Sequence, residues 1–554
     1  MYFKIAANKS TNSHPLIFIF ILLSSFFISA CGGGDGDPAP IPEQKTKLTS
    51  SQASAFLNRA TFGATRKSID DLVNSNLEDW LQQQLLSPPS RLLPYIQSLA
   101  GQEDINPNHR VQGWWLNVVH GDDQLRQRVA FALSEILVVS DQNDFLFNRQ
   151  AAMANYYDIL VNNAFGNYRE LLEKVTLSPV MGVYLSMLGN QKPDPENNIR
   201  PDENYAREIM QLFSIGLVEL NQDGSAVTDG QGNPVASYDQ DIIEGFAHVF
   251  TGWTFYGATD FRWPDINMIR EMEPWEDFHD TEEKALLNDT ILPAGQTATE
   301  DLEMALDNIF EHNNVAPFIS HKLIQRLVTS NPSPAYINRV AAIFNDNGQG
   351  EKGDLEAVVI AIITDDEAFN GFQDMPNTFG KLREPLIRNA HLWRAFNAST
   401  NIGTLPFGWP EFFYGQSPQR APHVFNYFYP DYQPPGEISD GGLVAPEFQI
   451  ATAGNLTGMH NVLLYLTLGY YYDDNPGEDD DIALDLDELA AIANNHNQLV
   501  DQLDLIFTAG QMSAEMKEEI ISYLGQFSAQ DNERLKVVEA TFLILTSNEY
   551  VIQK

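Results

Sequence analysis

Apolar residues recur every three or four positions along most of this 554-residue chain, the spacing that puts them on one face of an α-helix. The segments Tyr168 to Leu177 and Glu203 to Ile215 show the pattern, and Gly216 stands where helices often end. Thr49 to Gln52 resembles a capping box before another apolar run. We therefore expect a mainly α fold.

Further helices are expected from Ser68 to the prolines at 88 and 89, and from Asp123 to Val139. Turn-forming residues near 217–238 predict a small β-hairpin or loop insertion. Residues 401–450 are rich in Pro, Gly and aromatics and should be irregular. We expect residues 48–554 to form a large multi-helical single domain, or two subdomains that divide near 370–400.

The first 31 residues have the parts of an export signal. Residues 1–14 contain Lys4 and Lys9 and no acidic residue. Residues 15–30 are almost wholly apolar, but this segment is shorter than the ~20 residues that span a bilayer. The sequence Ile-Ser-Ala-Cys at 28–31 resembles the lipobox of bacterial lipoproteins. We expect residues 1–30 to be a lipoprotein signal peptide and Cys31 to be lipidated. The alternatives are a plain signal peptide with a chance Cys and an uncleaved anchor.

Residues 31–47 begin with glycines and continue with prolines, which predicts a flexible tether. Several acyl chains on Cys31 would hold the protein to a membrane firmly, where one would not. Gly32 follows the lipobox in place of an Asp, which favours the outer membrane. The expected location is thus the bacterial cell envelope, on the periplasmic or the surface face. Cys31 is also the only cysteine, so the body has no disulfide and no thiol nucleophile.

The formal net charge of −42 excludes one class of partner. Nucleic-acid binding needs cations that neutralise phosphates, so we expect no nucleic-acid partner. The same charge argues against an electrostatic grip on anionic lipid. It is typical of a solvated acidic surface.

Several local motifs together resemble one bacterial family, domain of unknown function 1800 (DUF1800). The motifs are LNRATFG at 57–63, ENYAREIMQLF at 203–213, TGW at 251–253, FHD at 278–280, PHVFNYFYP at 422–430 and LVAPEF at 443–448. The resemblance covers roughly residue 50 to the C-terminus. It implies a largely helical secreted protein, without an activity. It also implies a sulfatase-like partner protein encoded nearby.

One stretch departs from that family. Many members carry histidines after the early amphipathic helix, whereas here residues 131–136 read FALSEI. A site built on those histidines would be absent from this chain.

The most specific motif also holds the first candidate site. Glu203 and Arg207 are four residues apart, and Glu208 borders the apolar stripe of the same predicted helix. A partly buried carboxylate beside an arginine is a plausible catalytic acid/base pair or ligand clamp. Tyr205 and Gln211 would then contact the ligand. The alternative is an ordinary salt bridge one helical turn long, within a polar network that joins helices.

A second candidate site is the dipeptide His279-Asp280, which lies among acidic residues and resembles the metal-binding dipeptide of helical phosphohydrolases. A divalent metal would need further His or Asp ligands from other helices. The alternative is an acidic surface loop. Trp253 and Tyr427 belong to an aromatic-rich zone, which favours either sugar binding or the packing of irregular loops.

Two functions remain open. The anchor, the tether and the aromatic zone favour a binding or assembly protein that acts on cell-surface or extracellular polymer. The second is a metal-dependent hydrolase that uses His279, Asp280 and the Glu203–Glu208 segment. The sequence contains no HExxH, GxSxG, Walker or GxGxxG motif.

Overall fold

The described chain consists of α-helices joined by loops, with two-stranded β-sheets at three places. The structure is a computed structural model that describes residues 46–101, 104–466, 481–527 and 532–554. The expected mainly α fold is confirmed. Cys31, the expected signal peptide and most of the tether lie outside the described residues. Residues 45–554 form one compact unit by their internal contacts.

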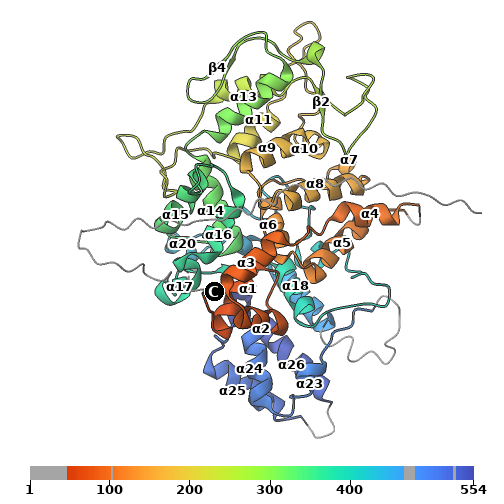
Figure 1. Ribbon diagram of the computed structural model, residues 1–554, viewed down its shortest axis with the longest axis vertical. Helices are drawn as coiled ribbons and strands as arrows, with labels where there is room; N and C mark the ends of the chain where they lie inside the picture. Colours follow the sequence, from red (N-terminus) through yellow and green to blue (C-terminus); the bar gives the residue numbers. More distant parts are fainter. Residues whose placement is uncertain (1–45, 102–103, 467–480, 528–531) are drawn as a thin grey trace, which may run out of the picture. The chain divides into compact units, whose positions relative to one another are not determined.

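The first part of the body is entirely helical (Figure 1). Its helices are α1 (Ser50–Ala60), α2 (Arg66–Asn74), α3 (Leu77–Leu86), α4 (Leu92–Leu99), α5 (Pro107–His120), α6 (Gln124–Ser134), α7 (Asp144–Phe147), α8 (Gln150–Asn162), α9 (Tyr168–Leu177) and α10 (Pro179–Tyr184).

The middle part combines helices with two small antiparallel sheets, β1–β2 and β3–β4. Its elements are α11 (Asn204–Gln211), α12 (Gln240–Val249), β1 (Trp253–Thr254), β2 (Glu273–Pro274), η1 (Glu276–Phe278), β3 (Lys284–Ala285), β4 (Ile291–Leu292), α13 (Ala298–Phe310), α14 (Val315–Leu327), α15 (Pro334–Asn345), α16 (Leu355–Thr364) and α17 (Asp366–Asp374).

The last part contains the expected irregular segment between residues 401 and 450, which holds only short helices. Its elements are β5 (Lys381–Leu382), α18 (Pro385–Ala395), α19 (Glu411–Tyr414), α20 (Glu437–Asp440), η2 (Pro446–Ile450), α21 (Ala453–Leu464), α23 (Asp487–Ala490), α24 (His496–Phe507), α25 (Ala514–Leu524), α26 (Glu533–Leu545), α27 (Asn548–Val551) and β6 (Ile552–Gln553).

Local capping signals decide where several helices begin and end. The capping box of Thr49 and Gln52 is present at α1. The single helix expected from Ser68 is wrong, because Asn76 accepts a hydrogen bond from the Asp79 amide at 2.9 Å and starts α3 as a separate helix. Similarly, α6 ends at Ser134, before the expected Val139.

The turn-rich stretch near 217–238 forms the expected hairpin-like insertion, held by isolated antiparallel bridges such as Val218 to Ala236. Helix α11 ends before it, sooner than the expected Ile215. The Gly216 amide donates to the Met210 carbonyl at 3.0 Å with a φ of +75°, a backbone conformation that favours glycine.

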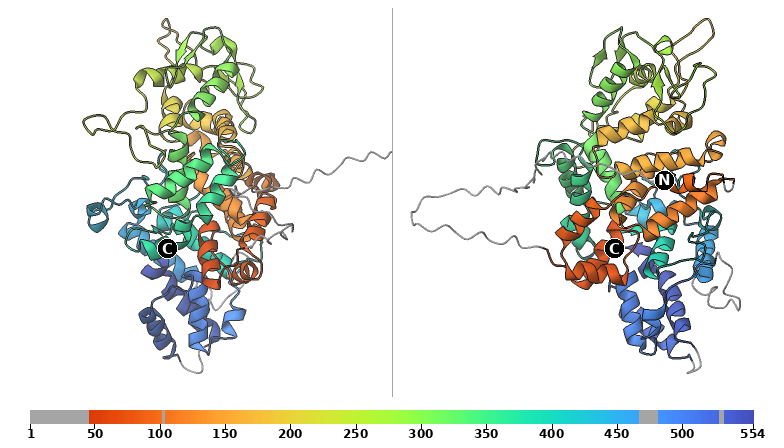
Figure 2. Two further views of the ribbon diagram at one scale, coloured as in Figure 1. Left: turned by 60° about the vertical axis from the view of Figure 1, so that its left-hand side comes forward. Right: turned by 45° about the vertical axis from the view of Figure 1, so that its right-hand side comes forward.

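The two ends of the described body lie side by side, as the views in Figures 1 and 2 agree. The Ser54 hydroxyl on α1 donates to the Leu505 carbonyl on α24 at 2.6 Å. Strand β6 pairs with β5 in an antiparallel sheet. In the core, Trp115 on α5 meets Trp393 on α18 edge to face, with ring centroids 4.8 Å apart. None of the described helices has the length and apolar character needed to cross a lipid bilayer.

A buried ionic network joins three distant parts of the chain. Lys381 lies 3.3 Å from Glu384 and 3.0 Å from Glu447, and all three side chains are almost fully buried. The Lys381 ammonium also donates to the Arg326 carbonyl on α14 at 2.9 Å. Charges removed from water persist only when they are paired and hydrogen-bonded, so these contacts fix β5, α14 and η2 against one another.

The same network continues into α6. Arg128 donates to the Arg326 carbonyl at 2.7 Å, and the Arg326 Nε atom lies 3.7 Å from a Glu135 carboxylate oxygen. Burial, together with the nearby charge of Glu384, raises the pKa of Glu135 well above its ordinary value. Burial opposes ionisation of Glu384 too, but the positive charges of Lys381, Arg128 and Arg326, together with a hydrogen bond from Glu135, outweigh it and lower the pKa of Glu384. Glu135 therefore keeps its proton to a higher pH than Glu384 does.

This difference in pKa predicts that Glu135→Gln and Glu384→Gln change the free energy of unfolding in different ways. Because the folded pKa of Glu135 is raised, its contribution to stability is complete below the unfolded pKa and is lost as pH rises through the folded pKa. Glutamine mimics the protonated acid, so the stability of Glu135→Gln relative to wild type should increase with pH. Glu384→Gln leaves buried cations uncompensated and should cost about 3–5 kcal/mol at neutral pH.

Urea unfolding of both variants across the neutral and mildly acidic range measures these differences. Equal pH dependence in wild type and Glu135→Gln would show that Glu135 is ionised in the folded protein.

Two glycines of α21 make a matched pair for a packing test. A Cβ atom on Gly458 would lie 1.7 Å from the Phe413 carbonyl oxygen, whereas one on Gly454 would meet only the Thr452 hydroxyl at 3.9 Å. We expect Gly458→Ala to lower the free energy of unfolding by about 1–3 kcal/mol or more, because the α19 backbone must move. Gly454→Ala should be neutral or stabilising. Chemical denaturation of both variants tests the contact, and similar midpoints would contradict it.

Candidate functional site

The Glu203–Arg207 pair forms as a local contact at the start of α11. A carboxylate oxygen of Glu203 lies 2.9 Å from the Arg207 guanidinium, and both side chains are more than one-third exposed. Gln240 at the start of α12 donates to the same Glu203 oxygen at 3.0 Å. These contacts match the structural alternative of a salt bridge that joins helices, and at this exposure the pair adds little stability.

Glu208 is a better candidate for chemistry than Glu203. Its side chain is nine-tenths buried, and within the described part of the chain its Oε2 atom has no hydrogen-bond partner. Burial raises the pKa of Glu208, while the nearby Arg207 acts in the opposite direction. Tyr184 and Tyr238 lie close enough to feel its charge, and burial is the main cause that raises the pKa of each to about 12. The Glu208 carboxyl could therefore transfer a proton to a ligand or form a hydrogen bond with it.

The proposed ligand contacts around this helix do not gather at one place. Tyr205 is buried, and its hydroxyl lies 2.6 Å from that of Thr176. Trp253 is buried in β1, and Gln211 is half-buried. Among the described residues, no hydrogen bond or ion pair links α11 to His279 or Asp280.

His279 is held inside the protein by contacts to both ring nitrogens. Its Nε2 atom lies 2.9 Å from an Asp301 carboxylate oxygen, and its Nδ1 atom lies 3.0 Å from the Thr251 carbonyl oxygen. The Lys284 ammonium lies 2.7 Å from the same Asp301 oxygen. These contacts hold the loop between η1 and β3 against α13. A metal ligand needs a free nitrogen lone pair, and here both nitrogens face protein oxygens.

Asp280 makes a separate contact, to the imidazole of His248 on α12. Burial opposes its ionisation, but the hydrogen bond from His248 and the Glu282 amide outweigh it and lower the pKa of Asp280 to about 2. In the described ranges, no three His, Cys, Asp or Glu side chains are placed to hold one metal ion. The metal hypothesis for His279 and Asp280 therefore gains no support from the geometry.

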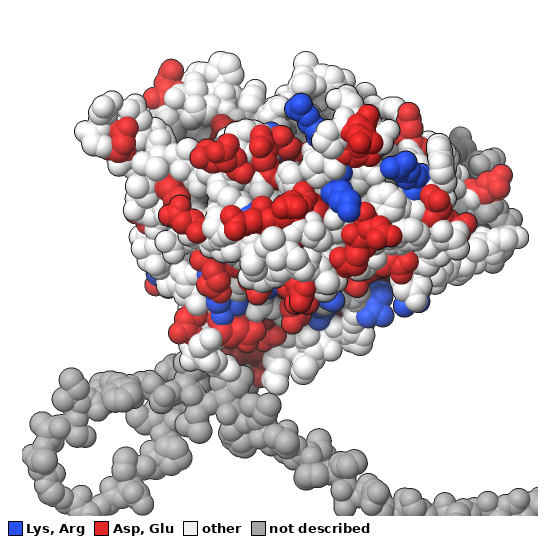
Figure 3. All heavy atoms as spheres, turned by 90° about the horizontal axis from the view of Figure 1, so that it is seen from above, with Lys and Arg blue, Asp and Glu red and all other residues white. Residues whose placement is uncertain are grey.

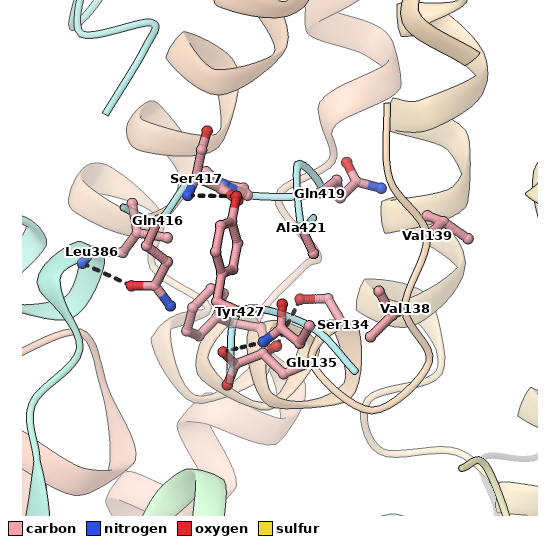
Figure 4. A pocket seen from close by; sticks show the side chains of 13 residues that line it. Ser134, Glu135, Val138, Val139, Leu386, Gln416, Ser417, Gln419, Ala421 and Tyr427 are labelled. Carbon is pink, nitrogen blue, oxygen red and sulfur yellow. Dashed lines mark hydrogen bonds between the residues drawn. The ribbon is translucent and has the colours of Figure 1, made fainter. Parts of the chain in front are cut away.

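Tyr427 lines a small internal cavity beside the ionic network (Figure 4). Its hydroxyl accepts from the Ser417 amide at 3.0 Å and donates to the Ser417 carbonyl at 2.9 Å. Asn426 donates to Glu135 at 2.9 Å across the same cavity. The cavity volume of about 10 Å³ accommodates roughly one water molecule. Tyr427 therefore packs an irregular loop onto α6, which was the alternative for the aromatic zone.

A cleft of about 880 Å³ opens on the described part of the protein. Helices α1, α2 and α3 contribute residues to it, as do the ends of α5 and α18 and the exposed side of α24. Its lining is mixed. Amides and hydroxyls such as Gln83, Ser68 and Gln498 alternate with the aromatic rings of Trp80 and Phe396.

Sequence reasoning missed both this cleft and the ionic network. Glu135 lies within residues 131–136, where the sequence pointed only to the histidines that this chain lacks. Arg394 in the cleft belongs to no motif. The one available signal was an ionisable residue inside an otherwise apolar helix pattern, as at Glu135 and Arg128.

A scan against protein families matches residues 55–552 to the family described as Protein of unknown function (DUF1800). No curated protein and no solved structure matches the chain. The match extends over nearly the whole described body and includes every motif on which the resemblance was based. This protein therefore belongs to the DUF1800 family.

Proposed function

We propose that this protein is a lipid-anchored binding protein of the bacterial cell envelope that holds extracytoplasmic polysaccharide in the large cleft. The observation that carries the proposal is the cleft itself. Its volume of about 880 Å³ lies within the range of ligand sites, roughly 300–1,000 Å³. The lipobox at Cys31 and the tether would place it outside the cytoplasm.

The lining of the cleft suits a ligand rich in hydroxyl groups. Exposed or half-exposed amides and hydroxyls, including Gln83, Asn397 and Gln502, can each donate and accept hydrogen bonds. Trp80 and Phe396 lie behind this polar lining and are 9% and 3% exposed, so they contribute only a small apolar area to the cleft wall. The cleft also differs from much of the surface. Figure 3 shows a face near α13 on which acidic side chains clearly outnumber basic ones.

The metal-dependent hydrolase is a weaker candidate, because in the described part of the chain no hydrogen bond or ion pair links His279 to the Glu203–Glu208 segment. A sulfatase-like partner remains part of the proposal. Such an enzyme could act on polymer that the cleft holds.

Two neighbouring glutamines of α3 allow a controlled test. Gln83 lines the cleft, whereas Gln82 is exposed on the same helix and does not belong to the lining. We expect Gln83→Trp to fill part of the cleft and weaken polysaccharide binding by about tenfold or more, since a clash excludes the ligand. Gln82→Trp adds the same indole outside the cleft and should bind as wild type does.

Affinity electrophoresis of the full-length protein in gels that contain dextran, polygalacturonate or carrageenan measures this binding. Failure of the wild-type protein to bind any of these polymers, or equal binding by the two variants, would refute the proposed function.

A further inference from the structure

Arg394 is a fixed cation on the wall of the cleft. It lies in the last turn of α18, and its Nε atom donates to the Gly63 carbonyl at 3.2 Å. Its Nη1 atom donates to the carbonyls of Val118 and Val119 at 3.3 and 3.1 Å, at the end of α5. Three carbonyl contacts from two segments hold the guanidinium in one place, so its position is set before any ligand arrives.

Within the described residues, no carboxylate neutralises this guanidinium. The other cations of the cleft are paired, Arg66 with Asp70 at 2.8 Å and Lys67 with Asp71 at 2.6 Å. Arg394 takes part in no ion pair in the described part of the chain, and its Nη2 atom has no hydrogen-bond partner there.

The absence of a counter-ion has an energetic consequence. Burial lowers the pKa of Arg394 to about 9, and no carboxylate offsets the effect. Asp122, Asp485 and Glu488 also line the cleft, but none of them contributes to that shift. The carbonyls at the end of α5 offer only a partial negative charge, about half an elementary charge for a whole helix end. An anionic ligand would supply the missing charge.

The composition of the chain makes this unpaired cation unusual. The chain has 75 Asp and Glu residues against 33 Lys and Arg residues, so most cations can find a carboxylate nearby, and Arg394 is an exception. Capping of α5 explains the contacts of Nη1, and the Gly63 carbonyl accepts from Nε, but neutral carbonyls leave the net charge of the group unneutralised. Guanidinium groups bind carboxylates and sulfates with strong, directional hydrogen bonds.

We propose that Arg394 is an anion-binding subsite of the cleft, and that the ligand is an acidic polysaccharide with carboxylate or sulfate groups. This inference rests on the proposed function and adds its substrate class. One acidic group of the polymer binds the Nη2 side of Arg394, while neutral sugar hydroxyls contact the amides of the cleft.

The test compares Arg394→Gln with Arg339→Gln, a control outside the cleft in which the lost cation already has a carboxylate partner, Asp365. The full-length variants are measured against polygalacturonate, κ-carrageenan and dextran, which carry carboxylate, sulfate and no charge. Wild type should prefer at least one acidic polymer over dextran by about tenfold. Arg394→Gln should lose that preference and keep its dextran affinity, while Arg339→Gln should keep the preference. The polymer that is preferred identifies the anionic group.

Two further measurements guard against a merely structural effect. Thermal unfolding shows whether Arg394→Gln is folded, and Arg394→Lys keeps the charge and should retain part of the preference. In wild type, the preference for an acidic polymer should fall as salt rises, because ions screen the interaction.

The outcomes separate the two proposals. If polymers bind in a Gln83-dependent way but Arg394→Gln keeps the acidic preference, or wild type shows none, the anion subsite is wrong and the cleft function stands. If Gln83→Trp has no effect, the cleft function fails and the subsite fails with it. If Arg394→Gln does not fold, the wild-type protein decides the test: a preference for the acidic polymer that does not fall as salt rises overturns the inference.

Discussion

The buried ionic network around Lys381 is the constraint on which the arrangement of the body depends. It gathers residues from five places: Arg128 from α6, Glu135 just after α6, Arg326 from α14, Glu384 before α18 and Glu447 from η2. Removing a charged member such as Glu384 would leave buried cations without compensation, which typically costs about 3–5 kcal/mol. The network therefore limits how these segments can be placed, more strictly than apolar packing alone would.

Helix α18 connects this network to the cleft. Lys381 and Glu384 lie just before its first residue, and Arg394 lies at its other end. Between them, Trp393 packs on Trp115 of α5, the helix whose terminal carbonyls hold Arg394. A binding group placed at the end of an anchored helix keeps its position better than one on a free loop. The buried charges would thus help to position the proposed anion-binding group.

The parts of the fold that the sequence predicts are those encoded locally. The capping box at Thr49, the helix from Tyr168 to Leu177 and the Glu203–Arg207 contact all depend on residues a few positions apart. The break before α3 was missed because Asn76 reads equally well as a polar residue within a helix and as a cap.

The network and the cleft could not be predicted in this way. Glu135 and Glu384 lie far apart in the chain, and the cleft joins residues from near both ends of the body. Their meeting depends on tertiary packing, which periodicity does not encode. His279 lies among acidic residues in the sequence, which suggested an exposed loop or a metal site. In the structure it is buried and contacts Asp301 and Thr251, because tertiary packing brings α13 against this segment.

The most direct test of this account is a crystal structure of the protein with a bound acidic oligosaccharide. The account predicts sugar rings in the cleft beside Gln83 and Gln502, with a carboxylate or sulfate oxygen within hydrogen-bond distance of Arg394 Nη2. An oligosaccharide bound elsewhere, or one in the cleft that turns its acidic group away from Arg394, would contradict it.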